Sequence, residues 1–118
     1  MSVLVSFAMF PTDKGDSVSP YVSKILNMFK ESDVDYKLSA MGTVFETESM
    51  KEALELINKA YSLLEDCNRV YSVVNIDAQK NKPKGRINGK IKSIEDKIGK
   101  VNSWFMLIFY QALIQQNK

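Results

Sequence analysis

A chain of 118 residues, 45% apolar and 25% charged, with a formal net charge of +2, has the composition of one small globular domain. It contains no histidine and a single cysteine, Cys67, which excludes an internal disulfide, a zinc site of thiolates and imidazoles, and a Ser-His or Cys-His dyad. We therefore expect a domain that holds no metal and no cofactor and is not an enzyme.

Residues 2–10 alternate in the manner of a strand, but with apolar side chains on both sides. One side would carry Val3, Val5, Phe7 and Met9, and the other Leu4, Ser6, Ala8 and Phe10. Pro11 and the polar run after it end this strand.

An amphipathic helix is predicted over residues 20–32. Ser19 is expected to be its N-cap and Pro20 to lie in its first turn, where a missing N–H costs nothing. Apolar residues then recur at helical spacing, at Val22, Ile25, Leu26 and Phe29.

Two short strands and a second helix come next. Residues 34–39 and 43–48 alternate between apolar and polar side chains and are joined tightly at Met41–Gly42. Ser49 and Glu52 have the spacing of a capping box, and apolar residues continue beyond them at helical spacing.

Residues 69–77 are rich in β-forming residues and give a fourth strand, so the order is βαββαβ. Both helices can be buried if they lie on one face of an antiparallel sheet, with right-handed crossovers. The fold class predicted is therefore α+β, a ferredoxin-like βαββαβ sandwich with an added C-terminal helix and an apolar tail.

The added helix is indicated by isoleucines at helical spacing, with Gly99 as its C-cap; they are Ile87, Ile91, Ile94 and Ile98. Residues 80–100 contain eight basic residues and only two acidic ones, Glu95 and Asp96, so this segment carries a net charge of +6. A basic segment can bind nucleic acid or other anions, but a solvated surface is the commoner explanation.

Residues 1–100 are expected to form the domain and residues 101–118 a carboxyl-terminal extension. The extension contains seven consecutive apolar residues, 104–110, and we expect it to be at least partly helical and to pack into a hydrophobic groove. It is shorter than the roughly 20 residues that a membrane-spanning helix needs. Since the amino terminus also lacks the pattern of a secretory signal, we expect a cytoplasmic protein with no membrane partner.

A ferredoxin-like sheet leaves one face without helices, and in a monomer that face should be polar. The first and fourth predicted strands are instead apolar on both sides. A second subunit or the extension must cover this face, and we favour a homo-oligomer.

The strand entrance at residues 41–46 carries the clearest candidate site. Gly42 permits an unusual backbone, Thr43 offers a hydroxyl, Phe45 a ring, and Glu46 places a carboxylate within an apolar strand. Glu46 could face solvent or pair with a lysine, or it could accept hydrogen bonds from a cationic or amino-bearing ligand.

Other candidates are weaker. Ser17 and Ser19 lie at the mouth of the first helix, where free amides suit anions, although simple capping is a sufficient explanation. Tyr36 could stack on a heteroaromatic ring, as could Tyr71 and Trp104, although aromatic residues on strands usually belong to a core or an interface. Cys67 follows Glu65 and Asp66, which should raise the pKa of its thiol, so we do not expect it to be reactive.

A four-stranded ferredoxin-like sheet is also the scaffold of the RNA-recognition motif. The third strand of that motif carries a basic residue, a glycine and exposed aromatic residues. Residues 42–48 here read GTVFETE, which is acidic with one aromatic residue, so no nucleic-acid partner is expected.

Several of these features together resemble the small thiamine-binding protein family, over residues 2 to about 100. They are Pro11 after the first strand, Ser17, Ser19 and Tyr21 at the start of the first helix, Met41-Gly42-Thr43-Val44-Phe45-Glu46, and Arg69-Val70. The sequence departs from the family pattern at Ala40, Thr47, Gln79 and Lys80.

The resemblance implies a ferredoxin-like fold, dimers joined through their sheets that often form tetramers, and binding of thiamine or its hydroxymethylpyrimidine part without catalysis. It also implies Thr43 and Glu46 as pocket residues, followed by Ser17 and Ser19. The function predicted is a cytoplasmic, non-enzymatic, homo-oligomeric binding protein for thiamine or a related pyrimidine. The alternatives are an interaction module without a small-molecule ligand and, less favoured, a small enzyme whose general base is Glu46 or Asp77.

Overall fold

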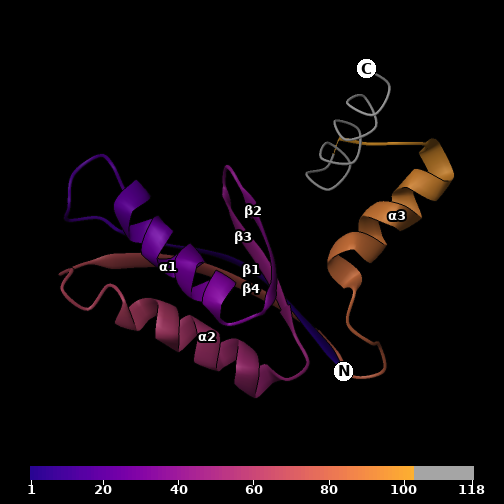
Figure 1. Cartoon of the computed structure of the whole chain (residues 1–118), viewed down its shortest axis with the longest axis horizontal. Coiled ribbons are helices and arrows are strands. Elements are labelled where there is room, and N and C mark those ends of the chain that lie inside the picture. Colours follow the sequence, from indigo (N-terminus) through magenta and orange to yellow (C-terminus); the bar gives the residue numbers. More distant parts are fainter. Residues whose placement is uncertain (103–118) are drawn as a thin grey trace. The chain divides into compact units, whose positions relative to one another are not determined.

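The computed structural model describes residues 1–102. Its elements are β1 (Ser2–Pro11), α1 (Ser19–Glu31), β2 (Asp35–Ser39), β3 (Gly42–Thr47), α2 (Met50–Ser62), β4 (Val70–Gln79) and α3 (Arg86–Ile98) (Figure 1). The four strands form one antiparallel sheet in the order β2-β3-β1-β4, with α1 and α2 on one of its faces. This confirms the predicted ferredoxin-like α+β fold with an added helix.

The chain divides after Ile87 into two units. The sheet, α1 and α2 belong to the first unit, whereas most of α3 belongs to the second. The predicted helix and packing of the extension fall on residues that, from Ser103 onward, lie outside the described part of the chain. Among residues 1–102, no helix is long and apolar enough to cross a membrane.

The start of α1 differs from the prediction. The helix begins at Ser19 itself, with Val18 as the N-cap residue, and no side chain caps it. The first intrahelical hydrogen bonds run from Tyr21 and Val22 to the carbonyl of Val18, so the first turn begins one residue earlier than expected. Ser19 is therefore not the N-cap, although Pro20 does lie in the first turn.

Two other helix ends match their predictions. Ser49 caps α2, and its hydroxyl accepts a hydrogen bond from the backbone N–H of Glu52. Gly99 follows α3 with a φ of +87°, and its N–H donates to the carbonyl of Glu95 at 2.8 Å.

The core lies between the sheet and the two helices that cover it. Phe7 of β1, Phe29 of α1 and Phe45 of β3 form its aromatic centre, with ring centroids 5.1 to 6.1 Å apart. Val3 and Val5 are completely buried on the same side of β1. This is one of the two sides of the strand that the sequence of residues 2–10 predicted to be apolar.

The second side of β1 and β4 faces away from the helices. The register pairs Phe10 with Tyr71 and Ala8 with Val73, so these side chains share the helix-free face. The rings of Phe10 and Tyr71 are 5.9 Å apart, and Tyr71 and Val73 are 53% and 44% exposed. The predicted apolar patch on this face therefore exists, while its covering by a second subunit stays a prediction.

Gly42 begins β3 where the backbones of β3 and β1 approach closely. A Cβ added at Gly42 would lie 2.9 Å from the carbonyl oxygen of Phe7, which belongs to the backbone and cannot rotate away. We expect Gly42→Ala to lower the free energy of unfolding by about 1 to 3 kcal/mol in urea titrations, because the strands must separate.

Gly89→Ala is the matched control. Gly89 lies within α3 and an added Cβ there meets no atom within 4 Å, so this variant should be neutral or slightly stabilised. Equal stability of the two variants would contradict the close approach at Gly42.

Candidate functional site

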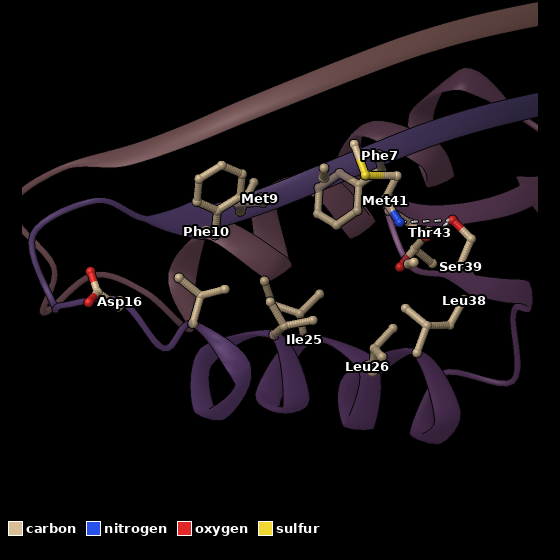
Figure 2. Close-up of a pocket in the computed structure, with 15 residues that line it drawn as sticks. Phe7, Met9, Phe10, Asp16, Ile25, Leu26, Leu38, Ser39, Met41 and Thr43 are labelled. Carbon is tan, nitrogen blue, oxygen red and sulfur yellow. Dashed lines mark hydrogen bonds between the residues drawn. The ribbon is translucent and has the colours of Figure 1, made fainter.

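A cavity of about 480 Å³ opens between α1, the carboxyl-terminal half of β1 and the β2–β3 hairpin (Figure 2). Its walls are mostly apolar, with Ile25 and Leu26 from α1, Phe7 and Met9 from β1, and Leu38 from β2. A concave apolar site of this size is typical of small-molecule pockets.

A few polar residues also line this cavity. Ser39 and Thr43 come from the two strands of the hairpin, and Asp16 from the loop before α1. Among the described residues that line it, Asp16 alone is charged. A ligand in this cavity would therefore meet hydroxyl groups, apolar surfaces and one carboxylate.

The hairpin that forms one wall is held by its own polar groups. The hydroxyl of Ser39 donates to the carbonyl of Gly42 at 3.0 Å and accepts from the N–H of Met41 at 3.3 Å. Met41 is 89% exposed and lines the cavity from the tip of this turn. An exposed methionine at the rim can adapt to a ligand because its side chain is unbranched.

Three of the predicted site residues lie at or beside this cavity. Thr43 lines it and is 5% exposed. Ser17 and Ser19 are exposed and do not line the cavity, whereas their sequence neighbours Asp16 and Val18 do line it.

Two predicted aromatic residues lie in or against the core. Phe45 is completely buried, and its ring is 5.1 Å from that of Phe29. Tyr36 is half-buried and stacks on the ring of Phe29, with the two ring centroids 6.1 Å apart. Neither residue lines the cavity, and both pack in or against the hydrophobic core instead.

Glu46 lies on the opposite face of the sheet from Thr43. The register pairs Thr43 with Phe7 on the helix-covered face and Glu46 with Leu4 on the helix-free face. Glu46 is 1% exposed and so does not face solvent, and it forms no salt bridge with a lysine within residues 1–102. The structure therefore does not bring these two predicted residues into one site.

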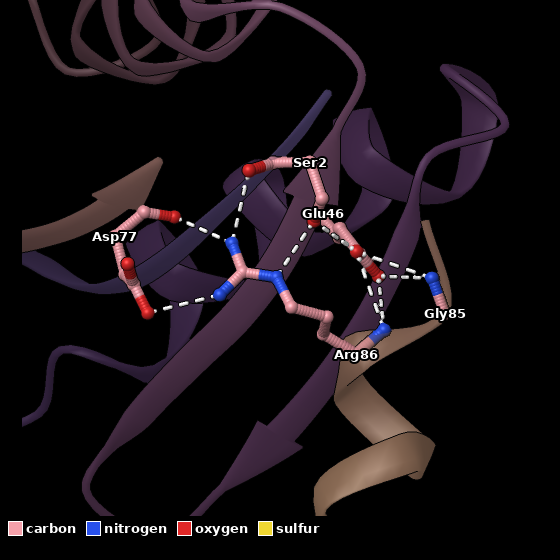
Figure 3. A network of polar contacts seen from close by, with 5 residues as sticks. All are labelled: Ser2, Glu46, Asp77, Gly85 and Arg86. Atoms are coloured by element: carbon pink, nitrogen blue, oxygen red, sulfur yellow. Dashed lines mark hydrogen bonds and ion pairs between the residues drawn. The ribbon is translucent and has the colours of Figure 1, made fainter. Parts of the chain in front are cut away.

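The carboxylate of Glu46 instead binds the start of α3 (Figure 3). It accepts hydrogen bonds from the backbone N–H groups of Gly85 at 3.0 Å and Arg86 at 3.2 Å, and from the hydroxyl of Ser2. A helix amino terminus has free N–H groups and a partial positive charge, so a carboxylate there stabilises it.

Arg86 completes this cluster. Its guanidinium donates to the hydroxyl and carbonyl of Ser2, and it pairs with the carboxylate of Asp77 at 2.9 Å. Arg86 is 5% exposed, although the sequence placed it within a basic segment expected to be solvated. Ser2 lies 84 residues away and Asp77 lies nine residues away, across the loop before α3, so no helical or strand periodicity pointed to the burial of Arg86.

These contacts set the pKa of Glu46. Burial acts to raise it, but the hydrogen bonds from Ser2, Gly85 and Arg86 outweigh burial and hold the pKa below its ordinary value of 4.5. Glu46 is thus an ionised carboxylate whose acceptor sites are used by the chain itself.

Two other expectations concern reactive groups. Burial, together with the nearby Asp66 and Asp13, raises the pKa of the Cys67 thiol, in the direction predicted. Within residues 1–102, no group of three or more His, Cys, Asp or Glu side chains could hold a metal ion.

Comparison with known proteins gives one consistent family. A model described as thiamine-binding protein matches residues 5–95. A UPF0045 protein of Methanocaldococcus jannaschii is 39% identical over 93 residues, which are 78% of this chain and 91% of that protein. A UPF0045 protein of Methanothermobacter thermautotrophicus is 32% identical over 70% of this chain and 84% of its own length.

Solved structures agree with this assignment. The crystal structure of the Methanocaldococcus protein superimposes with a TM-score of 0.69 at 38% identity, covering 79% of this chain and 95% of that one. A Thermotoga maritima protein assigned provisionally to thiamine biosynthesis or salvage has a TM-score of 0.67 over 80% of this chain and 99% of that one. At 15% identity the latter supports the fold alone.

The Glu46 cluster should make stability depend on pH. Because the folded-state pKa is lowered, the ionised carboxylate stabilises the protein above its unfolded pKa, and this contribution is lost as pH falls through the folded pKa. We expect Glu46→Gln to lower the free energy of unfolding by about 2 to 3 kcal/mol near neutral pH and by less in acid.

Urea titrations at about pH 7 and about pH 4 would measure this difference. Glu48→Gln is the matched control, because Glu48 is an exposed carboxylate just beyond the same strand. A stability loss in Glu46→Gln that is the same at both pH values would contradict the role of the ionised form.

Proposed function

The chain belongs to the thiamine-binding protein family, and we propose that it is a non-enzymatic binding protein for thiamine or its hydroxymethylpyrimidine part. The observation that carries the proposal is the cavity between α1 and the β2–β3 hairpin, which lies within the residues matched by the family. Its volume of about 480 Å³ suits a ligand of two small linked rings.

The chemistry of the cavity supports a heteroaromatic ligand. Phe7, Ile25 and Leu26 offer apolar surface to a ring and its methyl group, while the hydroxyl of Thr43 can bond to a ring nitrogen or an exocyclic amine. The hydroxyl of Ser39, whose proton is donated to the carbonyl of Gly42, can accept from the amine. This division into apolar walls and a few polar groups would orient a pyrimidine.

The charge of thiamine adds a second criterion. Its thiazolium ring is a permanent cation, whereas hydroxymethylpyrimidine is neutral near pH 7. The carboxylate of Asp16, which lines the cavity, would favour the cation. Because Asp16 is exposed, its contribution to binding should be modest.

The remaining predicted residues receive supporting roles in this proposal. Ser17 and Ser19 would contact parts of a ligand that project toward the start of α1. Tyr36 and Phe45 would fix the wall through the core, and Glu46 would hold β3 from its other face. Only Thr43 of the predicted set is proposed as a direct contact within the cavity.

We further propose that the protein is a homo-oligomer joined through the helix-free face. Tyr71 and Val73 of β4 are about half exposed there, beside Phe10 and Ala8 of β1. An exposed patch of this kind on a sheet is typical of a subunit interface. The same patch also fits an interaction module without a ligand, and ligand titration distinguishes the two functions.

Substitutions in the cavity should separate the two parts of thiamine recognition. We expect Thr43→Val to weaken binding of both thiamine and hydroxymethylpyrimidine about tenfold, because a hydroxyl partner is lost. Asp16→Asn should weaken binding of thiamine up to about fivefold and leave the neutral pyrimidine unaffected. Isothermal titration calorimetry measures both.

Thr43→Ser, which keeps the hydroxyl, and Glu65→Gln, an exposed carboxylate not lining the cavity, are the controls. If the folded wild-type protein releases no heat and shows no saturation with either compound, the binding proposal is wrong and the interaction module is favoured.

The interface can be tested without a ligand. We expect light scattering to give a mass well above the 13.4 kDa of one chain, and Val73→Lys to shift it toward the monomer, because the new charge would be buried in the interface. Leu54→Lys on α2, where the leucine is 51% exposed, should leave the mass unchanged. A monomeric wild-type protein at micromolar concentration would refute the proposed assembly.

A further inference from the structure

Helix α3 has a basic surface and an apolar row that the proposed ligand site does not use. Ile87, Ile91, Ile94 and Ile98 recur at spacings of four, three and four residues, which places them on one side of the helix. Ile94 is 50% exposed and Ile98 is 72% exposed. The carboxyl-terminal half of this row is therefore open to solvent in the described part of the chain.

Lysines border this row on one flank, and Glu95 lies on the other. At 100° per residue, Lys90 and Lys97 lie on the same flank of α3, beside the isoleucines, whereas Asp96 lies on the opposite side of the helix. Both lysines are exposed, and neither forms a salt bridge with another described residue. Glu95, the other acidic residue of this segment, accepts a hydrogen bond from the N–H of Val101 at 3.0 Å.

The chain on both sides of α3 continues this character. Lys80 and Lys82 precede the helix and Lys100 follows it, and all three are exposed. The family match ends at residue 95, and the sequence beyond it contains the apolar and aromatic run at residues 104–110. Lysines flanking an apolar row, followed by aromatic residues, are the composition of segments that bind at a membrane surface.

We propose that the exposed face of α3 binds the surface of a membrane that contains anionic lipids. The lysines would be attracted to anionic headgroups, and Ile94 and Ile98 would insert among the adjoining acyl chains. This binding is peripheral, so it needs no spanning helix. It differs from the expectation of no membrane partner, which rested on the lack of a segment long enough to cross one.

The arrangement favours a lipid surface over the other possible occupants. A nucleic acid would use the lysines but would gain little from exposed isoleucines, because duplex binding is dominated by phosphate contacts. A second copy of this helix would bring Lys90 and Lys97 close to the like charges of its partner. An anionic lipid surface complements both the charge and the apolar row.

The test is co-sedimentation of the full chain with vesicles. We expect binding to phosphatidylcholine vesicles that contain about one-third phosphatidylglycerol, at least tenfold weaker binding to vesicles of phosphatidylcholine alone, and weakening as salt increases. Failure to bind the anionic vesicles, or equal binding to both kinds, overturns the proposal. Neither result depends on thiamine binding, which is measured separately by calorimetry.

Two pairs of variants assign the binding to α3. Lys90→Gln combined with Lys97→Gln should weaken binding about tenfold, while Lys51→Gln combined with Lys59→Gln, the same charge change on α2, should not. Ile94→Ser should weaken binding severalfold, while Leu54→Ser, a substitution at a side chain of equal exposure on α2, should not.

Ile94 could instead be covered by another surface of the protein. If Ile94→Ser lowers the melting temperature or the solution mass without changing vesicle binding, the row packs against the chain itself or a second copy, and the proposal is wrong. Equal loss in the α2 control variants would also overturn it, because the effect would then reflect overall charge or hydrophobicity.

Discussion

The alternation of side chains along β3 separates the cavity from the polar cluster. Because neighbouring residues of a strand point to opposite faces, Thr43 and Phe45 face α1 and α2 whereas Glu46 faces away from them. One short strand therefore contributes to two separate features, the cavity on the helix-covered face and the polar cluster on the other. A one-residue shift in register would exchange them and bury Glu46 in the apolar core.

The polar cluster shows why a carboxylate can be stable within an apolar strand. Burying an ionised group is costly unless hydrogen bonds replace its water, and Glu46 receives them from Ser2 and from the first N–H groups of α3. Arg86 shares Ser2 with Glu46 and also pairs with Asp77. The cluster thereby connects β1, β3, β4 and the beginning of α3.

The two faces of the sheet give the molecule different kinds of surface. The helix-covered face contains a cavity with apolar walls and few polar groups, which suits a small ligand. The helix-free face has a polar cluster at one end and exposed Tyr71 and Val73 toward the other, which suits a protein surface. The proposed ligand binding and the proposed assembly are therefore compatible, because they would use opposite faces of the same sheet.

Periodicity, capping residues and turn residues act over a few positions, so the amino-acid sequence was sufficient to predict the secondary structure, the fold class and the family. For this reason Ser49 was predicted correctly as the N-cap of α2 and Gly99 as the C-cap of α3. The N-cap of α1 was predicted one residue too late, at Ser19, because several residues near Pro20 could begin the helix. Which residues share a site depends on contacts between distant parts of the chain. The donors to Glu46 lie 39, 40 and 44 residues away, and the separation of Thr43 from Glu46 depends on the strand register, so neither could be read from local spacing.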